Sequence, residues 1–202
     1  MQRSVYCNRG GVDAARAARQ SQLMDHATPP RIVDCSQAAH ATAILEILND
    51  AILNSTALYD YQARTSENMT AWFKAKADGR FPVLGAVDER GELLGFASYG
   101  TFRPWPAYKY SVEHSVYVHA SRRGHGVGLA LLRALIARAL EQQYHVMVGG
   151  IDRDNRASIA LHEKLGFVHT GTLPQVGFKF GRWLDLAFYQ LLLATPADPR
   201  DG

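Results

Sequence analysis

The stretch SVEHSVYVHASRRGHGVGLALLRALIARAL, residues 111–140, determines how this chain is best interpreted. It begins with the alternation of a strand, continues through a short loop rich in arginine and glycine, and ends in a helix with apolar residues at helical spacing. Unpaired N–H groups at a helix N-terminus, together with the helix dipole, bind anions such as phosphate. Gly124, Gly126 and Gly128 would let the backbone approach such a ligand closely. The stretch therefore predicts an anion-binding strand-loop-helix.

The glycine spacing distinguishes this loop from two common phosphate-binding loops. For the pattern G-x-G-x-x-G the third glycine comes one residue too early, and no acidic ribose-binding residue follows a second strand. The G-K-[ST] ending of a P-loop is missing as well. The loop instead fits R-x-x-G-x-G over residues 123–128, preceded by Val-Tyr-Val at 116–118.

Length and composition indicate a single domain. At 202 residues, with 47% hydrophobic and 20% charged residues, the chain can bury one substantial core. The net charge is +3, but basic and acidic residues are interleaved, so no basic stripe suited to a nucleic acid is present. We therefore expect no nucleic-acid partner, and the mild basicity suits an anionic cofactor.

Cysteine usage and hydropathy favour a cytoplasmic location. Cys7 and Cys35 have no metal-binding spacing and form no disulfide framework, so they resemble the thiols of a reducing compartment. No apolar run approaches the length of a bilayer-spanning helix, and the N-terminus lacks the apolar core of a secretory signal. We expect a cytoplasmic protein with no membrane partner.

The two ends of the chain differ in composition from its middle. Residues 1–30 are rich in arginine and alanine and end in two prolines, which predicts a flexible extension outside the fold. Residues 31–193 form the expected domain. The polar, proline-rich residues 194–202 are expected to be a flexible tail.

Turn residues and apolar periodicity predict helices and strands between these ends. Ser36 and Asn155 are expected helix N-caps, and Gly79 is an expected C-cap. The strands at 112–119 and 145–151 should be parallel, because a helix of crossover length separates them. The other expected helices are 36–53, 66–79 and 156–165, and the other expected strands are 31–35, 82–88, 92–101, 167–172 and 183–193, the last two joined by 177–181.

Four segments in order, VEHSVYV, RGHGVG, NRASIALHEKLGF and GRWLDL, resemble the phosphinothricin and methionine sulfoximine N-acetyltransferase branch of the GNAT superfamily. The resemblance covers about Pro30 to Leu193. It implies an α/β (α+β) GNAT fold, a mixed twisted sheet of six to seven strands flanked by helices, with acetyl-CoA between two splayed parallel strands. It also implies a homodimer. Leu48 replaces an expected tyrosine and Tyr59 a common tryptophan, both at positions expected near the acceptor.

By this resemblance the loop and its flanks hold acetyl-CoA. The strand edge at 116–118 would pair with the pantetheine arm, and the loop would hold the diphosphate. The alternatives are an ordinary glycine-rich turn with a solvated arginine and a strand that only packs in the core. The implied cofactor-binding residues are Val116, Tyr117, Val118, Arg123, Gly124, His125, Gly126, Val127, Gly128, Leu129, Asn155 and Lys164.

Glu113 is the main candidate for a general base. Strand alternation puts it with Ser115 and Tyr117 on one face, and Val112 and His114 on the other. A carboxylate inside a central strand should have a raised pKa, which suits a base for an ammonium substrate. The resemblance also places this residue at the substrate, whereas the alternative is a structural salt bridge or a solvated strand face.

His162 is the second catalytic candidate. It occupies the place where many members of the superfamily carry the tyrosine that protonates the leaving thiolate, and a histidine can donate or relay a proton. The alternative is a polar-face residue on a short helix. It does not begin an H-E-x-x-H zinc site, because position 166 is glycine, and we expect no metal.

The resemblance places the acceptor beside the loop at 102–108. The implied substrate-binding residues are Arg103, Pro106, Ala107, Tyr108 and Glu113. An arginine there could hold a carboxylate or phosphinate with two hydrogen bonds, and the alternative is an exposed loop arginine. Lys179, Trp183 and Asp185 match the closing segment, where they would line the acceptor pocket or a dimer interface.

The sequence thus predicts an acetyl-CoA-dependent N-acetyltransferase that acts on the primary amine of a small amino-acid-like acceptor, of the phosphinothricin or methionine sulfoximine or sulfone type. Direct attack in a ternary complex is expected, because no cysteine stands in the motifs. The alternatives are an acetyltransferase for protein N-termini or polyamines, and a non-catalytic acyl-CoA-binding sensor.

Overall fold

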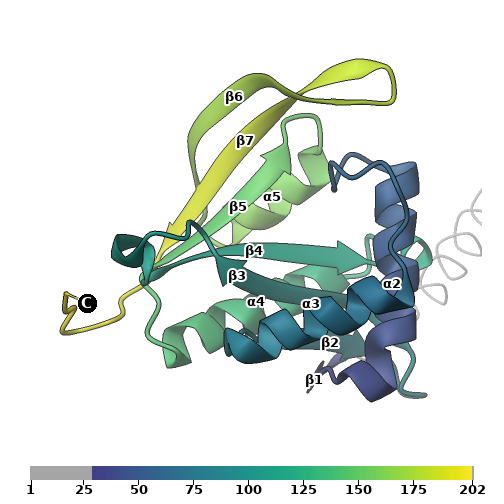
Figure 1. The fold of residues 1–202 in the computed structure, drawn as a ribbon, viewed down its shortest axis with the longest axis horizontal. Coiled ribbons are helices and arrows are strands. Elements are labelled where there is room, and N and C mark those ends of the chain that lie inside the picture. Colours follow the sequence, from purple (N-terminus) through teal and green to yellow (C-terminus); the bar gives the residue numbers. More distant parts are fainter. Residues whose placement is uncertain (1–28, 202) are drawn as a thin grey trace, which may run out of the picture.

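The computed structural model describes residues 29–201, which form a seven-stranded sheet with helices on both faces (Figure 1). The strand order is β1-β2-β3-β4-β5-β7-β6, and neighbours are antiparallel except β4 and β5, which are parallel as predicted. The expected mixed sheet of six to seven strands is confirmed. The strands are β1 (Arg31–Asp34), β2 (Val83–Val87), β3 (Leu93–Thr101), β4 (Ser111–Val118), β5 (Val146–Asp152), β6 (Val168–Lys179) and β7 (Arg182–Leu192).

The helices begin and end where local sequence signals place them. Ser36 Oγ accepts the N–H of Ala39, and Asn155 Oδ1 accepts the N–H of Ser158, so both predicted N-caps are confirmed. Gly79 is the predicted C-cap. The helices are α2 (Gln37–Asn54), α3 (Ser66–Asp78), α4 (Val127–Glu141) and α5 (Arg156–Lys164), with short 3-10 turns η1 (Pro106–Tyr108) and η2 (Ala120–Arg122).

The two faces of the sheet carry separate hydrophobic cores. Helices α4 and α5 cover one face, where Leu131 and Leu135 are fully buried against the strands. Helices α2 and α3 cover the other face, around Ile44, Met69 and Phe96. Each core removes apolar surface from water, which is the main stabilising term of such a fold.

Strand β4 contributes side chains to both cores in strict alternation. Val112 is buried in the core beneath α4. Tyr117 points to the other face and packs on Phe96, with ring centroids 5.3 Å apart. The predicted division of this strand into two faces is therefore confirmed, and Glu113 shares the face of α2 and α3.

Strands β6 and β7 form a long hairpin that projects past the rest of the sheet (Figure 1). The predicted connector at 177–181 is wrong, because Gly177, Phe178 and Lys179 pair with β7 and only Phe180 and Gly181 turn. The pairing shifts register between Leu173 and Gly177 and then resumes, which local glycine signals do not reveal. Both turn residues have positive φ, as tight hairpins require.

The structure describes the C-terminal end of the chain but only the last residues of the predicted N-terminal extension. Residues 1–28 of the extension predicted at 1–30, which include Cys7, lie outside the described residues. The segment after β7 has no helix or strand. It contacts the body of the domain, since Arg200 N donates to Tyr110 Oη at 3.1 Å and His145 Nδ1 lies 2.9 Å from the Thr195 carbonyl.

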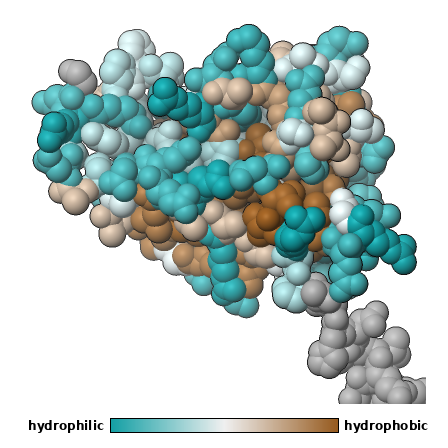
Figure 2. Space-filling view, turned by 90° about the horizontal axis from the view of Figure 1, so that it is seen from below, coloured by the Kyte–Doolittle hydropathy of each residue, from teal (hydrophilic) through white to brown (hydrophobic). Residues whose placement is uncertain are grey.

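The side of the domain shown in Figure 2 is mainly polar. Hydrophilic residues lie around its edge, and apolar residues are visible near its middle. Across residues 29–201, no helix is long and apolar enough to cross a bilayer.

Candidate active site

The sheet opens into a fork between its two parallel strands. Strands β4 and β5 pair only from Ser111 with Val146 to Glu113 with Val148. Beyond that point β4 stays bonded to β3 and β5 to β7, but not to each other. Past that point the N–H and C=O groups that the two strands turn toward each other form no strand-to-strand hydrogen bonds. The Val118 carbonyl accepts from Arg123 Nε, and the other groups can bind a ligand.

A cavity of about 680 Å³ occupies this fork. Both strands line it, together with the glycine-rich loop, the first turn of α4, the start of α5 and the segment that follows α2. Every predicted cofactor-binding residue lines the cavity except His125, whose Nδ1 instead lies 2.8 Å from the Arg123 carbonyl. The predicted residues in the wall are Val116, Tyr117, Val118, Arg123, Gly124, Gly126, Val127, Gly128, Leu129, Asn155 and Lys164.

The glycine-rich loop brings the N-terminus of α4 to the cavity. Gly124 and Gly126 have φ of 80° and 79°, a conformation that side chains other than glycine rarely adopt, and the space beside both Cα atoms is open. Gly128 differs, because a Cβ there would lie 3.3 Å from Leu161 of α5. The first two glycines therefore shape the loop, and the third allows close packing against α5.

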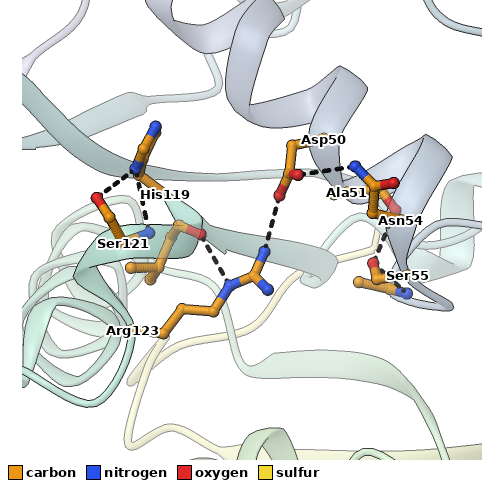
Figure 3. A network of polar contacts seen from close by, with 9 residues as sticks. Asp50, Ala51, Asn54, Ser55, His119, Ser121 and Arg123 are labelled. Atoms are coloured by element: carbon orange, nitrogen blue, oxygen red, sulfur yellow. Dashed lines mark hydrogen bonds and ion pairs between the residues drawn. The ribbon is translucent and has the colours of Figure 1, made fainter.

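Arg123 lines the cavity and reaches from the loop to Asp50 of α2 (Figure 3). Its Nε donates to the Val118 carbonyl at 3.3 Å, and its Nη2 pairs with Asp50 Oδ2 of α2 at 3.1 Å. The side chain is 53% exposed, so the guanidinium remains open to a ligand. An anionic group bound here would share this cation with Asp50.

Glu113 lies in the cavity wall at the last paired position of β4. Burial raises the pKa of its carboxyl above the ordinary value, and the positive charge of Arg103 opposes that rise. The raised pKa agrees with the expectation from its place in a central strand. Gly150 on β5 leaves room for this side chain, because a Cβ there would lie 3.3 Å from Glu113 Oε1.

His162 also lines the cavity, on the opposite face of the sheet from Glu113. It is 4% exposed, and burial lowers its pKa. Its Nδ1 lies 2.6 Å from the Ser158 carbonyl and its Nε2 lies 3.2 Å from Nε2 of His114. The sequence had placed His114 only on a strand face, since nothing local shows that α5 brings a second histidine to it.

The loop predicted to bind the acceptor does not line the cavity. Arg103 packs its guanidinium over Phe102, 4.4 Å from the ring centroid, and donates to the Phe102 carbonyl. Its positive charge still lowers the pKa of Glu113. Pro106, Ala107 and Tyr108 form the turn η1 and are exposed.

Tyr59, at a position that the resemblance placed near the acceptor, and Asp152, which was not assigned from sequence, both line the cavity. Tyr59 Oη and Asp152 Oδ2 are buried atoms of residues that line the cavity, and neither has a hydrogen-bond partner. Burial raises the pKa of Tyr59 to about 12, and the charge of Asp152 adds to the rise. Buried polar groups without a hydrogen bond are uncommon, and the nearest charged partner of Asp152 Oδ2 is Arg182 Nη2, at 3.7 Å.

The hairpin tip holds the segment that carries Tyr59. Lys179, predicted to line an acceptor pocket or dimer interface, instead donates to the carbonyls of Ile52, Ser55 and Leu58 at 2.6 to 2.8 Å. Gly177 lies against the Tyr59 ring. Trp183 is 59% exposed on the hairpin, and Asp185 pairs with Arg153 at 3.2 Å.

The cavity wall offers groups that suit an organic cofactor with an anionic part. Within residues 29–201, no three or more His, Cys, Asp or Glu side chains gather where they could hold one. The cavity combines a helix N-terminus and an arginine for an anionic group, free strand edges for an amide-bearing chain, and a half-buried carboxylate beside them. These features fit a thioester cofactor that carries a diphosphate.

Comparisons with known proteins agree with this fit. Residues 43–167 match the acetyltransferase (GNAT) family. The L-methionine sulfoximine/L-methionine sulfone acetyltransferase of Pseudomonas paraeruginosa is 52% identical over 155 residues, 77% of this chain and 90% of that protein. The L-amino acid N-acyltransferase of Escherichia coli is 45% identical, over 81% of this chain and 95% of that protein.

A solved structure shows the same fold with the cofactor bound. The GNAT superfamily phosphinothricin acetyltransferase of Sinorhizobium meliloti, in complex with acetyl-CoA, superposes with a TM-score of 0.82 at 34% identity, over 87% of this chain and 94% of that one. This chain belongs to the acetyltransferase (GNAT) family and is an acetyl-CoA-dependent N-acetyltransferase.

Proposed function

We propose that this enzyme acetylates the primary amine of a small amino-acid-like acceptor of the methionine sulfoximine, methionine sulfone or phosphinothricin type. The observation that carries the proposal is Glu113, a half-buried carboxylate with a raised pKa at the point where the two parallel strands separate. The named activities of similar proteins support the acceptor class.

The fork supplies the cofactor site. The N–H groups of the loop and of the first turn of α4, with the Arg123 guanidinium, would hold the diphosphate. The free edge of β4 at 116–118 would pair with the pantetheine amides. Asn155 and Lys164 of α5 would complete the site from the opposite wall.

The chain's own groups fit a direct transfer. Glu113 would remove a proton from the acceptor ammonium, through water, so that the amine can attack. A backbone N–H near Val118 would polarise the thioester carbonyl. His162 lies in the cavity wall, where an imidazole can take part in relaying a proton to the leaving thiolate. Cys35, the cysteine in the described part of the chain, does not line the cavity, so nothing supports an acetyl-cysteine intermediate.

The acceptor side favours an amino acid over a peptide. We assign Arg103, with Pro106, Ala107 and Tyr108, to the carboxylate of the amino acid, and this role requires the loop at 102–108 to move toward the cavity. Tyr59 and Asp152 offer one hydroxyl donor and one carboxylate acceptor to the rest of the molecule. The cavity is walled on that side by the segment after α2.

The remaining expectations from the sequence stay part of this proposal. We propose a cytoplasmic homodimer, with residues 31–193 as the catalytic domain. The exposed apolar side chains of the β6–β7 hairpin support the dimer, because apolar clusters of this kind mark protein interfaces.

An acceptor panel tests the proposal. Purified enzyme with acetyl-CoA should release free CoA fastest with methionine sulfoximine, methionine sulfone or phosphinothricin, and slowly with polyamines and peptides. Turnover of peptides or polyamines alone would reject the acceptor class. The Glu113→Gln variant should bind acetyl-CoA normally and lose turnover by about 10²-fold or more. Binding without turnover of any amine in the wild type would instead indicate an acyl-CoA sensor.

A further inference from the structure

Two histidines meet at the fork of the cleft and contact each other. His114 is the first residue of β4 beyond the paired segment, and His162 reaches it from α5. The two rings are 18° from parallel, with centroids 5.0 Å apart. Both residues line the cavity and both are buried. They therefore form one unit at the place where the reacting groups are proposed to meet.

The hydrogen bonds determine where the protons of this pair lie. The Ser158 carbonyl can only accept, so His162 Nδ1 must carry a proton and donate it. In a neutral His162 ring Nε2 is then a bare acceptor, and the 3.2 Å contact requires His114 Nε2 to donate. This leaves His114 Nδ1 as a bare lone pair. That nitrogen is buried and has no partner.

Both rings are held neutral. Burial and the facing imidazole of His162 lower the pKa of His114 to about 3, and burial lowers that of His162. Neither nitrogen of neutral His162 is free to donate a proton toward the cleft. The unpartnered His114 Nδ1 is therefore the one place where the neutral pair can accept a proton without breaking a hydrogen bond.

Strand β5 is shaped to admit the pair. A Cβ on Gly149 would lie 2.9 Å from His114 Nε2 and 3.3 Å from His162 Nε2, closer than side chains tolerate. The next residue, Gly150, leaves space for Glu113 in the same way on the other face. Two adjacent glycines thus admit a carboxylate on one side of the fork and two imidazoles on the other.

The proposed acetyl transfer moves more protons than Glu113 alone can handle. As the N–C bond forms and the C–S bond breaks, the ammonium nitrogen loses two protons, and the sulfur gains one. Glu113 takes the first proton and passes it to solvent. The second must leave the nitrogen after attack, and the thiolate needs one at the same stage.

We propose that His114 and His162 act as one acid–base unit, in which His114 Nδ1 accepts the second proton and returns it to the leaving thiolate while His162 shares the charge. This inference rests on the proposed acetyl transfer. The pair ends each cycle as it began, so the protons balance. His162 then acts through His114 rather than by direct contact with the sulfur.

Glutamine variants test the unit, because an amide can keep a donor and an acceptor but cannot transfer a proton. We expect His114→Gln and His162→Gln each to lower kcat about 10- to 100-fold, with the dissociation constant for acetyl-CoA changed less than about twofold. The double variant should lose no more kcat than the more impaired of the two single variants, because the two histidines act together. His145→Gln, an exposed histidine, is the matched control and should keep the wild-type kcat.

The outcomes of the glutamine variants separate a failure of this inference from a failure of the proposed function. Multiplicative losses in the double variant would mean that the histidines act independently, and a wild-type kcat for His114→Gln would remove His114 from the chemistry. If the wild type turns over the acceptor panel while His114→Gln is unaffected, only this inference fails. If the wild type acetylates no amine, the proposed function and this inference fail together.

A measurement on the unaltered protein does not depend on the variants folding. Nitrogen-15 correlation spectra of the histidine rings distinguish the two neutral tautomers. We expect the Nδ1–H form for His162 and the Nε2–H form for His114. An Nε2–H form of His162 would contradict the proton placement and overturn the inference, even if both glutamine variants had lost activity through misfolding.

Discussion

At the scale of single residues, the pKa of Glu113 links the geometry to a measurable pH dependence. Burial raises this pKa and Arg103 lowers it. A general base must be ionised, so kcat/KM should fall as pH falls through an apparent pKa above the usual carboxyl value of about 4.3. Replacing Arg103 with glutamine removes the lowering charge and should move this acidic limb to higher pH. An unmoved or lowered limb in pH profiles of the two enzymes would contradict the assignment.

Asp50 gives a second test at this scale, because it competes for the Arg123 guanidinium at 3.1 Å. Asp50→Asn should free the arginine and remove a negative charge near the diphosphate site. Exposed ion pairs contribute about 0.2 to 1 kcal/mol, so CoA should bind roughly 1.5- to 5-fold more tightly, by calorimetry at low salt. Asp78→Asn, which breaks the exposed pair with Lys74, should leave the affinity unchanged. Weaker binding by Asp50→Asn would show that the pair instead orders the site.

At the scale of elements, the β6–β7 hairpin positions the segment after α2. Lys179 gives its three donors to carbonyls at and beyond the C-terminus of α2, where helix carbonyls lack partners. Tyr61 Oη adds a bond to the Phe178 carbonyl at 2.6 Å. The wall that carries Tyr59 is therefore attached to the hairpin at several points.

Lys179→Met should loosen this attachment. It leaves buried carbonyls without a donor, which costs about 1 to 3 kcal/mol, so the midpoint of thermal unfolding should fall by roughly 3 to 10 °C. The KM for the acceptor should rise more than the KM for acetyl-CoA, because the affected segment is proposed to face the acceptor. Lys74→Met, at a lysine that is 73% exposed, is the matched control and should shift the midpoint little. Equal midpoints for the two variants would refute the role of Lys179.

The elements also show what could be read from sequence and what could not. Ser36, Gly79 and Asn155 signal helix ends through local hydrogen bonding, so those boundaries were predictable. The contact between His114 and His162 depends on how α5 packs over the fork, 48 residues away in sequence. The attachment made by Lys179 depends on a hairpin meeting a helix end, which no local pattern encodes.

At the scale of the whole molecule, the site arises because the sheet consists of two parts that meet only at the base of β4 and β5. One part is β1 to β4 with the loop and α4, and the other is β5 to β7 with α5. The resemblance of four short segments implied this cleft, since they fall on both parts. The acceptor wall was less predictable, because residues 102–108 do not line the cavity and residues after α2 do.

The assembly proposed for the whole molecule follows from the outer surface of the hairpin. Val176, Phe178, Phe180 and Trp183 are each 47% to 59% exposed, and Phe178 and Trp183 pack with ring centroids 5.1 Å apart. An apolar cluster beside an edge strand is favourable only when another surface covers it, so the 22.3 kDa chain should sediment as a dimer. Trp183→Glu should shift it to the monomer mass, whereas Trp105→Glu, at a tryptophan that is 69% exposed on another loop, should not. A wild-type protein that stays monomeric at all concentrations would reject the homodimer.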